Sequence, residues 1–179
     1  MRKIIYFIEF ILIKILFIIF KLIGYKFSSN LGFLIGIIFG PLFKSKKQII
    51  KNLEKANIQK KQNLKKIASN VLGNYGRIFA EYVHLEDFRN NKLNKYISIE
   101  GNEHLNDLKK SKKKAIFISG HFNNFELMAM QIEKVGIELA AIYRPLNNVF
   151  LNKTMEKIRT ENICKNQIKK GRAGSREII

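Results

Sequence analysis

AIFISGHFNNFE, residues 115–126, joins a short apolar run to a polar turn and the start of a helical pattern. Residues 115–119 are rich in strand-forming apolar side chains, which is typical of a buried strand. Gly120 would end that strand. Asn123 and Asn124 suit the turn after it, because asparagine tolerates left-handed backbone angles. The stretch therefore predicts a strand, a turn and a helix in direct succession.

Two side chains of this stretch, His121 and Glu126, are of the kinds used in general base catalysis. On one ideal helix they would lie about 140° apart, so they converge only if His121 lies in the turn and Glu126 in the first helical turn. An unperturbed imidazole has a pKa of about 6.5 and can accept a proton from a hydroxyl. A carboxylate on its other nitrogen fixes the tautomer. The spacing equally fits a turn histidine followed by a glutamate that the helix dipole favours.

The flanking sequence repeats the same alternation of strand and helix. Strands are predicted at 96–100, 115–119 and 139–143, and each precedes a helical pattern. This order predicts an α/β fold in which helices cover a layered sheet and reactive loops follow the carboxyl ends of the strands. His121 and Arg144 both lie just past predicted strand ends. We therefore expect the two residues to share one site.

Residues 4–23 form an apolar segment of 20 residues, long enough to span a bilayer as a helix. Glu9, Lys14 and Lys21 interrupt it, and charges are costly at the centre of a bilayer. Three interpretations remain open: an uncleaved membrane anchor, an interfacial helix and a core helix of a soluble domain.

Residues 31–43 form a second apolar segment, which at 13 residues is too short to cross a bilayer alone. Gly32, Gly36 and Gly40 recur every four residues and would let another helix approach closely. A flexible apolar connector is the alternative. Because positive charges flank the region on both sides, residues 1–43 are predicted to form a membrane anchor or interfacial hairpin, with the remaining chain on the cytoplasmic side.

Two amphipathic helices are expected next, at 48–56 and 60–83, with Ser45 as the N-cap of the first. Arg77 and Glu81 are spaced for an ion pair on the helix surface.

The chain has a net charge of +19, which favours an anionic partner such as a membrane surface, a phosphorylated lipid or nucleic acid. A general bias of composition toward Ile, Lys and Asn would produce the same excess. Cys164 is the only cysteine, which excludes a disulfide framework and a cysteine-based metal site.

Four blocks of the sequence resemble the bacterial lipid A late acyltransferases, the lauroyl and myristoyl transferases. GHFNNFE at 120–126 is similar to that family's G-H-F-G-N-W-E block. YRPLNN at 143–148 and KGRAG at 170–174 resemble its second and third blocks, and residues 96–105 resemble the strand and turn upstream. Asn123 stands where glycine is usual, and Phe125 where tryptophan is usual.

The resemblance implies transfer of a fatty acyl chain from an acyl carrier protein thioester to a hydroxyl of a lipid A precursor. His121 would be the general base and Glu126 its orienting carboxylate. No metal or organic cofactor is implied, because the thioester supplies the activation. The resemblance also implies binding of substrate by the following residues: Asn124, Arg144, Asn147, Arg172 and Gly174.

The same resemblance implies a location in the bacterial inner membrane, with the catalytic part on the cytoplasmic face. No nucleic-acid partner is expected, because the sequence contains no RNA- or DNA-reading motif and its aromatic residues lie in apolar runs, not between basic residues. Family members are longer, so residues 44–179 are expected to be the N-terminal part of the catalytic domain, truncated at its C-terminus. Two alternatives stay open: an acyltransferase for another membrane lipid acceptor such as a glycerophosphate, and an inactive membrane-bound basic fragment.

Overall fold

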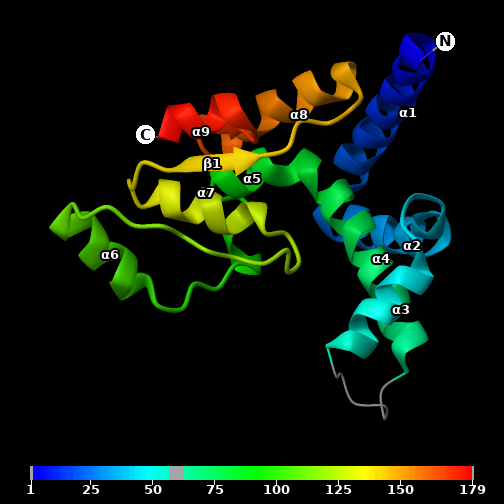
Figure 1. Cartoon of the computed structure of the whole chain (residues 1–179), viewed down its shortest axis with the longest axis horizontal. Helices are drawn as coiled ribbons and strands as arrows, with labels where there is room; N and C mark the ends of the chain where they lie inside the picture. The colour runs from blue at the N-terminus through cyan, green and yellow to red at the C-terminus, as the bar shows by residue number, and fades with distance from the viewer. Residues whose placement is uncertain (1, 57–62, 179) are drawn as a thin grey trace. The chain divides into compact units, whose positions relative to one another are not determined.

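The computed structural model describes residues 2–56 and 63–178, and it divides into two compact units (Figure 1). One unit contains Met1–Ile15 and His84–Ile179, and the other contains Leu16–Val83. The predicted boundary between residues 43 and 44 therefore lies inside the second unit. The functional division into a membrane part and a catalytic part stays a prediction.

The unit Leu16–Val83 is helical. It contains the end of α1 (Arg2–Ile23), α2 (Tyr25–Phe43), α3 (Lys46–Lys55) and α4 (Leu64–Glu81). Ser45 caps α3 by accepting a hydrogen bond from Gln48 N at 3.3 Å, as predicted. The predicted amphipathic helices are confirmed, although residues 57–62 lie outside the described part of the chain. Their apolar faces meet in a small core of Ile49, Ala68 and Leu72, with Ile50, Leu53 and Val71 around it.

Small residues bring α2 and α4 into backbone contact. A Cβ atom added to Gly36 would lie 2.5 Å from the Leu72 carbonyl oxygen, and one added to Gly76 would lie 2.1 Å from the Gly32 carbonyl oxygen. The predicted close approach of another helix to the glycine stripe is thus confirmed, with α4 as that helix. The surface pair predicted for Arg77 and Glu81 is wrong. Glu81 is buried and accepts a hydrogen bond from Ser29 Oγ at 2.7 Å.

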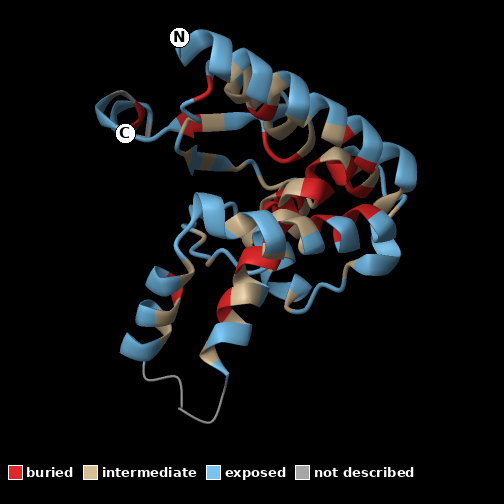
Figure 2. Cartoon of the chain, turned by 90° about the vertical axis from the view of Figure 1, so that its right-hand side faces the viewer, coloured by how far each residue is buried: buried red, intermediate tan, exposed pale blue. Residues whose placement is uncertain are grey.

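Within the described residues, α2 is the one helix long and apolar enough to cross a membrane by length and composition. The second apolar segment was predicted to be too short because its helix was expected to begin at residue 31. The helix in fact begins at Tyr25 and continues through Pro41 to Phe43. Helix α1 is continuous and leaves most of its surface exposed (pale blue in Figure 2), including many large apolar side chains.

The unit formed by Met1–Ile15 and His84–Ile179 contains most of the remaining elements. They are α5 (Leu85–Arg89), η2 (Asn94–Tyr96), α6 (Asn102–Ser111), α7 (Glu126–Lys134), β1 (Ala140–Tyr143), α8 (Val149–Asn162), β2 (Asn166–Lys169) and α9 (Arg172–Ile178). The short helix η1 (Tyr82–His84) precedes α5. Strands β1 and β2 pair in parallel, with Tyr143 opposite Lys169, and α8 is their crossover.

The predicted strands at 96–100 and 115–119 are wrong. Residues 113–122 form no regular structure and run as an extended coil between α6 and α7 (Figure 1), with Ile116 and Ile118 91% and 93% exposed. An apolar run forms a stable strand only where a neighbouring strand satisfies its backbone groups and a layer covers its side chains. In the described residues β1 and β2 pair only with each other. The fold is therefore largely helical α/β with a two-stranded sheet, and the predicted layered sheet is not formed by these residues.

The third predicted strand is confirmed as β1. The core of this unit is formed by α5, α7, α8 and β2, with Leu85, Phe88, Met130 and Ile163 almost fully buried. Cys164 is also buried, at 1% exposure, and burial raises the pKa of its thiol.

The glycine contact between α2 and α4 gives a test of the helical unit. Gly76→Ala should lower the free energy of unfolding by about 1–3 kcal/mol, because the added methyl group meets backbone atoms that cannot move aside. Thermal unfolding followed by circular dichroism in mild detergent would measure the loss.

Gly40→Ala is the matched control. Its Cβ would meet the Leu72 side chain at 3.0 Å, and the gain of about 0.5–1 kcal/mol in helix propensity offsets part of that contact. A Gly76→Ala variant as stable as the Gly40→Ala variant would contradict the backbone packing.

Candidate functional site

The loop before α7 places His121 at the surface. Asn123 adopts the left-handed φ of 44° expected of this turn, and its carbonyl oxygen accepts a hydrogen bond from Phe125 N at 3.0 Å. The turn brings the His121 ring against the Phe125 ring, with 4.3 Å between centroids. His121 is exposed, so its imidazole can be reached by a substrate.

Glu126, the first residue of α7, is buried at 8% exposure. Its Oε1 atom accepts hydrogen bonds from Arg159 Nε at 3.0 Å and from Arg159 Nη2 at 2.8 Å. In the structure Glu126 thus forms an ion pair with Arg159, and the His121 ring contacts the Phe125 ring. The predicted pairing of His121 with Glu126 stays a prediction.

Arg159 is the residue that the sequence analysis missed. It lies near the end of α8, 33 residues from Glu126, in a helix with a weakly apolar pattern. An arginine at such a position is most often solvated, so no local signal marked it. Removing one partner of a buried ion pair typically costs about 3–5 kcal/mol, because the other charge is left uncompensated.

A second group of polar contacts continues from Arg159 across the sheet. Its guanidinium lies 5.7 Å from the centroid of the Tyr143 ring. The Tyr143 hydroxyl donates a hydrogen bond to Glu156, and Lys169 Nζ lies 3.3 Å from the Glu156 carboxylate. Burial, followed by the hydrogen bond to Glu156, raises the pKa of Tyr143 to about 12. The same hydrogen bond is the main cause of the lowered pKa of Glu156.

The two predicted substrate-binding arginines follow the carboxyl ends of the paired strands. Arg144 comes directly after β1 and is exposed, and Arg172 is the exposed first residue of α9, after β2. Lys170 N donates a hydrogen bond to the Tyr143 carbonyl oxygen at 2.8 Å. The two loops therefore leave the same edge of the sheet and carry their cationic side chains there.

The other predicted residues differ in accessibility. Asn147 is exposed next to Asn148, the N-cap of α8, whereas Asn124 is buried and its carbonyl oxygen accepts a hydrogen bond from Leu127 N. Gly174 lies inside α9, where a Cβ would come 1.9 Å from the Lys169 carbonyl oxygen, and Gly171 is the turn residue, with φ of 130°.

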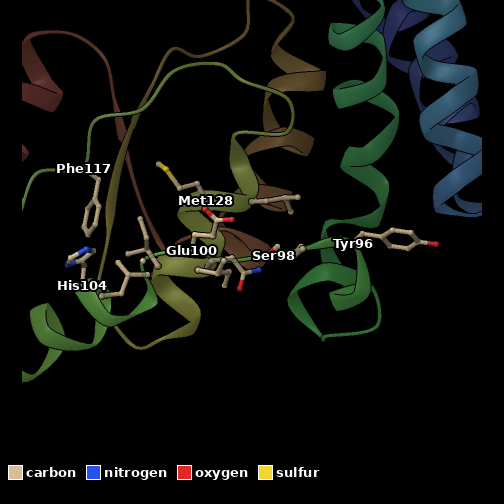
Figure 3. Close-up of a pocket in the computed structure, with 13 residues that line it drawn as sticks. Tyr96, Ser98, Glu100, His104, Phe117 and Met128 are labelled. Atoms are coloured by element: carbon tan, nitrogen blue, oxygen red, sulfur yellow. The ribbon is translucent and has the colours of Figure 1, made fainter.

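An apolar cavity of about 510 Å³ lies beside α7 (Figure 3). Its walls come from the segment 96–105, from Phe117 and from one side of α7. The rings of Phe117 and His104 line one end of the cavity, whereas the ring of Tyr96 points away from the other labelled side chains. Leu127 and Met128 line it from the helix that begins at Glu126. The described residues contain no group of three or more His, Cys, Asp or Glu side chains that could hold a metal ion.

A family model described as bacterial lipid A biosynthesis acyltransferase matches residues 1–170. The chain belongs to this acyltransferase family. Comparisons with curated proteins and with solved structures gave no match. Lipid A acyltransferases are membrane-associated enzymes, which agrees with the apolar surfaces of α1 and α2.

The contact between Tyr143 and Glu156 gives a test of the site's framework. At neutral pH, Tyr143→Phe should lower the free energy of unfolding by about 1 kcal/mol through loss of that hydrogen bond. A tyrosine in the unfolded chain has a pKa of about 10, whereas the pKa of Tyr143 in the folded protein is about 12. The stability that the bond provides is present below the unfolded value and is lost as the pH rises through the folded value.

The difference in stability between wild type and Tyr143→Phe should therefore shrink between about pH 10 and pH 12. Urea unfolding at several pH values would measure it, with Tyr75→Phe, an exposed tyrosine, as the control. A difference that stays constant across this range would contradict the assignment.

Proposed function

We propose that this member of the acyltransferase family transfers a fatty acyl chain from an acyl carrier protein thioester to a hydroxyl of a lipid A precursor, with His121 as the general base. The observation that carries the proposal is the loop 120–126. It presents an exposed imidazole directly before a carboxylate that Arg159 holds at the start of α7.

In the proposed reaction His121 removes the proton from the acceptor hydroxyl as its oxygen attacks the thioester carbonyl carbon. The tetrahedral intermediate then collapses, the carbon–sulfur bond breaks, and the proton passes from His121 to the departing thiolate. Glu126 orients the imidazole and balances its positive charge. Arg159 positions Glu126, because two of its nitrogens bind one carboxylate oxygen.

The acceptor carries anionic groups, and Arg144 and Arg172 are proposed to bind them. A guanidinium can bind a phosphate or carboxylate through two parallel hydrogen bonds. Their common position at the carboxyl edge of β1 and β2 supports this role. Asn147 is exposed beside the same edge and is proposed to hydrogen-bond the acceptor. The buried Asn124 and Gly174 are proposed to shape the site without touching substrate.

The cavity beside α7 is proposed to hold the acyl chain. Its lining is mainly apolar, and burying each methylene group of a chain is worth about 0.8 kcal/mol. It lies along the helix whose first residue is Glu126, so a chain placed there can extend from a thioester carbonyl near the loop. The bacterial inner membrane, with the site on the cytoplasmic face, is the proposed location.

The catalytic roles are tested with detergent-solubilised protein, a radiolabelled acyl carrier protein thioester and purified acceptors. His121→Ala and Glu126→Ala should each lower acyl transfer at least ~10²-fold, and the double variant should lose little more, because the two residues act as a unit. Glu103→Ala, an exposed glutamate outside the loop, is the matched control. Full activity in either single variant would exclude this mechanism. Transfer to a glycerophosphate but not to a lipid A precursor would replace the proposed acceptor.

The acyl cavity is tested by changing its volume. Met128→Trp adds bulk to the wall and should shift the preference toward shorter acyl chains, measured as the ratio of kcat/KM values across a series of thioesters. Ile116→Trp adds the same bulk at an exposed position outside the cavity and should leave the ratio unchanged. An active Met128→Trp protein with the wild-type preference would place the acyl chain elsewhere.

A further inference from the structure

Asn148, the N-cap of α8, is buried at 7% exposure and uses both ends of its side chain. Its Oδ1 atom accepts hydrogen bonds from Phe150 N at 3.1 Å and Leu151 N at 3.2 Å. Its Nδ2 atom donates to the Tyr6 carbonyl oxygen at 2.8 Å and to Glu9 Oε2 at 3.0 Å. One amide therefore begins α8 and also binds α1, which lies 139 to 142 residues away in the sequence.

Aromatic contacts surround this polar one. The Phe150 ring lies 5.6 Å from the Phe7 ring, in an edge-on arrangement, and 6.1 Å from the Phe10 ring. All of these residues belong to the unit of Met1–Ile15 and His84–Ile179. Glu9, an exposed carboxylate on an otherwise apolar helix, thus has a specific hydrogen-bond donor in the same unit.

Helix α8 connects this contact to the candidate site. It runs from Val149 to Asn162, and Arg159 in its last turns holds Glu126 through two hydrogen bonds to one oxygen. A continuous helix of this length is stiff along its axis, so a change in the position of its first turn moves its last turns. The orientation of Arg159 around the axis of α8 and its position along that axis therefore depend on how α8 begins.

We infer that the first turns of α1 are a working part of the acyltransferase unit, in which Glu9 and Asn148 are positioning residues that set Arg159 against Glu126. The effect of this arrangement on catalysis rests on the proposed function, whereas the coupling between α1 and the Arg159–Glu126 pair does not. The coupling goes beyond membrane attachment, because a helix that only anchored the protein would not require Glu9.

The test follows the exchange of the Arg159 Nε proton with solvent by nuclear magnetic resonance on the full chain in detergent. Asn148→Ser keeps an N-cap oxygen but removes both donor bonds to α1. It should speed the exchange by about tenfold or more, because the Arg159–Glu126 pair opens more often. Glu126→Ala, which leaves no acceptor at this position, defines the fully released limit, and Lys153→Gln, an exposed change on α8, should leave the exchange unchanged.

A charge exchange separates positioning from general loss of stability. Asn148→Asp keeps the cap but turns a carboxylate toward Glu9, so exchange should again be fast. Adding Glu9→Gln to that variant supplies a donor from the opposite side and should restore slow exchange in part, because the Tyr6 carbonyl oxygen still lacks its donor. A merely structural weakening would not be corrected by the second substitution.

Glu9→Ala leaves the cap of α8 intact and decides the question if Asn148→Ser does not fold. Wild-type exchange in Glu9→Ala, or a double variant as fast as Asn148→Asp alone, would overturn the inference. In acyl-transfer assays the same variants should lower kcat with little change in KM. Absence of acyl transfer in the wild type, with the exchange results as expected, would instead count against the proposed function alone.

Discussion

The ion pair between the buried Glu126 and the half-buried Arg159 joins α7 to α8 in the unit that carries the candidate site. A carboxylate at 8% exposure is tolerated only with a full partner, and the fork of Arg159 supplies two donors to one oxygen. Because Glu126 begins α7 and Arg159 lies in the last turn of α8, the pair links these two helices directly. The exposed loop of His121, the cavity wall along α7 and the crossover of the sheet are all attached to these two helices.

In the unit Leu16–Val83 the governing constraint is steric. The backbones of α2 and α4 touch where Gly36 and Gly76 lack side chains, and this contact buries Glu81 next to Ser29. An apolar helix with such a face is not uniformly apolar around its circumference. The length and composition of α2 are compatible with a membrane span, yet its glycine-bearing side packs specifically against α4 of the same chain.

Local patterns in the sequence predicted local structure well. The cap at Ser45 and the left-handed Asn123 each depend on neighbours within a few residues. The segment 115–119 could not be judged in this way, because strand formation depends on pairing with distant residues. Strand β2 was missed for the converse reason, since its sequence NQIK has no apolar run and is held by register with β1.

Local sequence patterns could not predict the contacts of Arg159 and Asn148, since their partners lie 33 and about 140 residues away. Family resemblance compensated for part of this, because its ordered blocks identified the loop of His121 without any knowledge of contacts. The resemblance did not predict the contacts that hold this loop in place, which are made by buried polar side chains at helix ends.

The burial of Cys164 has a practical consequence. The only thiol of the chain is shielded from solvent at 1% exposure, accepts a hydrogen bond from Gln167 Nε2 at 3.0 Å and has a raised pKa. Maleimide and other thiol reagents are electrophiles that an accessible thiolate attacks, so the native chain is close to inert toward them. A cysteine introduced at one chosen surface position could therefore carry a spin label or fluorophore without first removing the natural one, which makes the protein directly suited to site-specific spectroscopy in membranes.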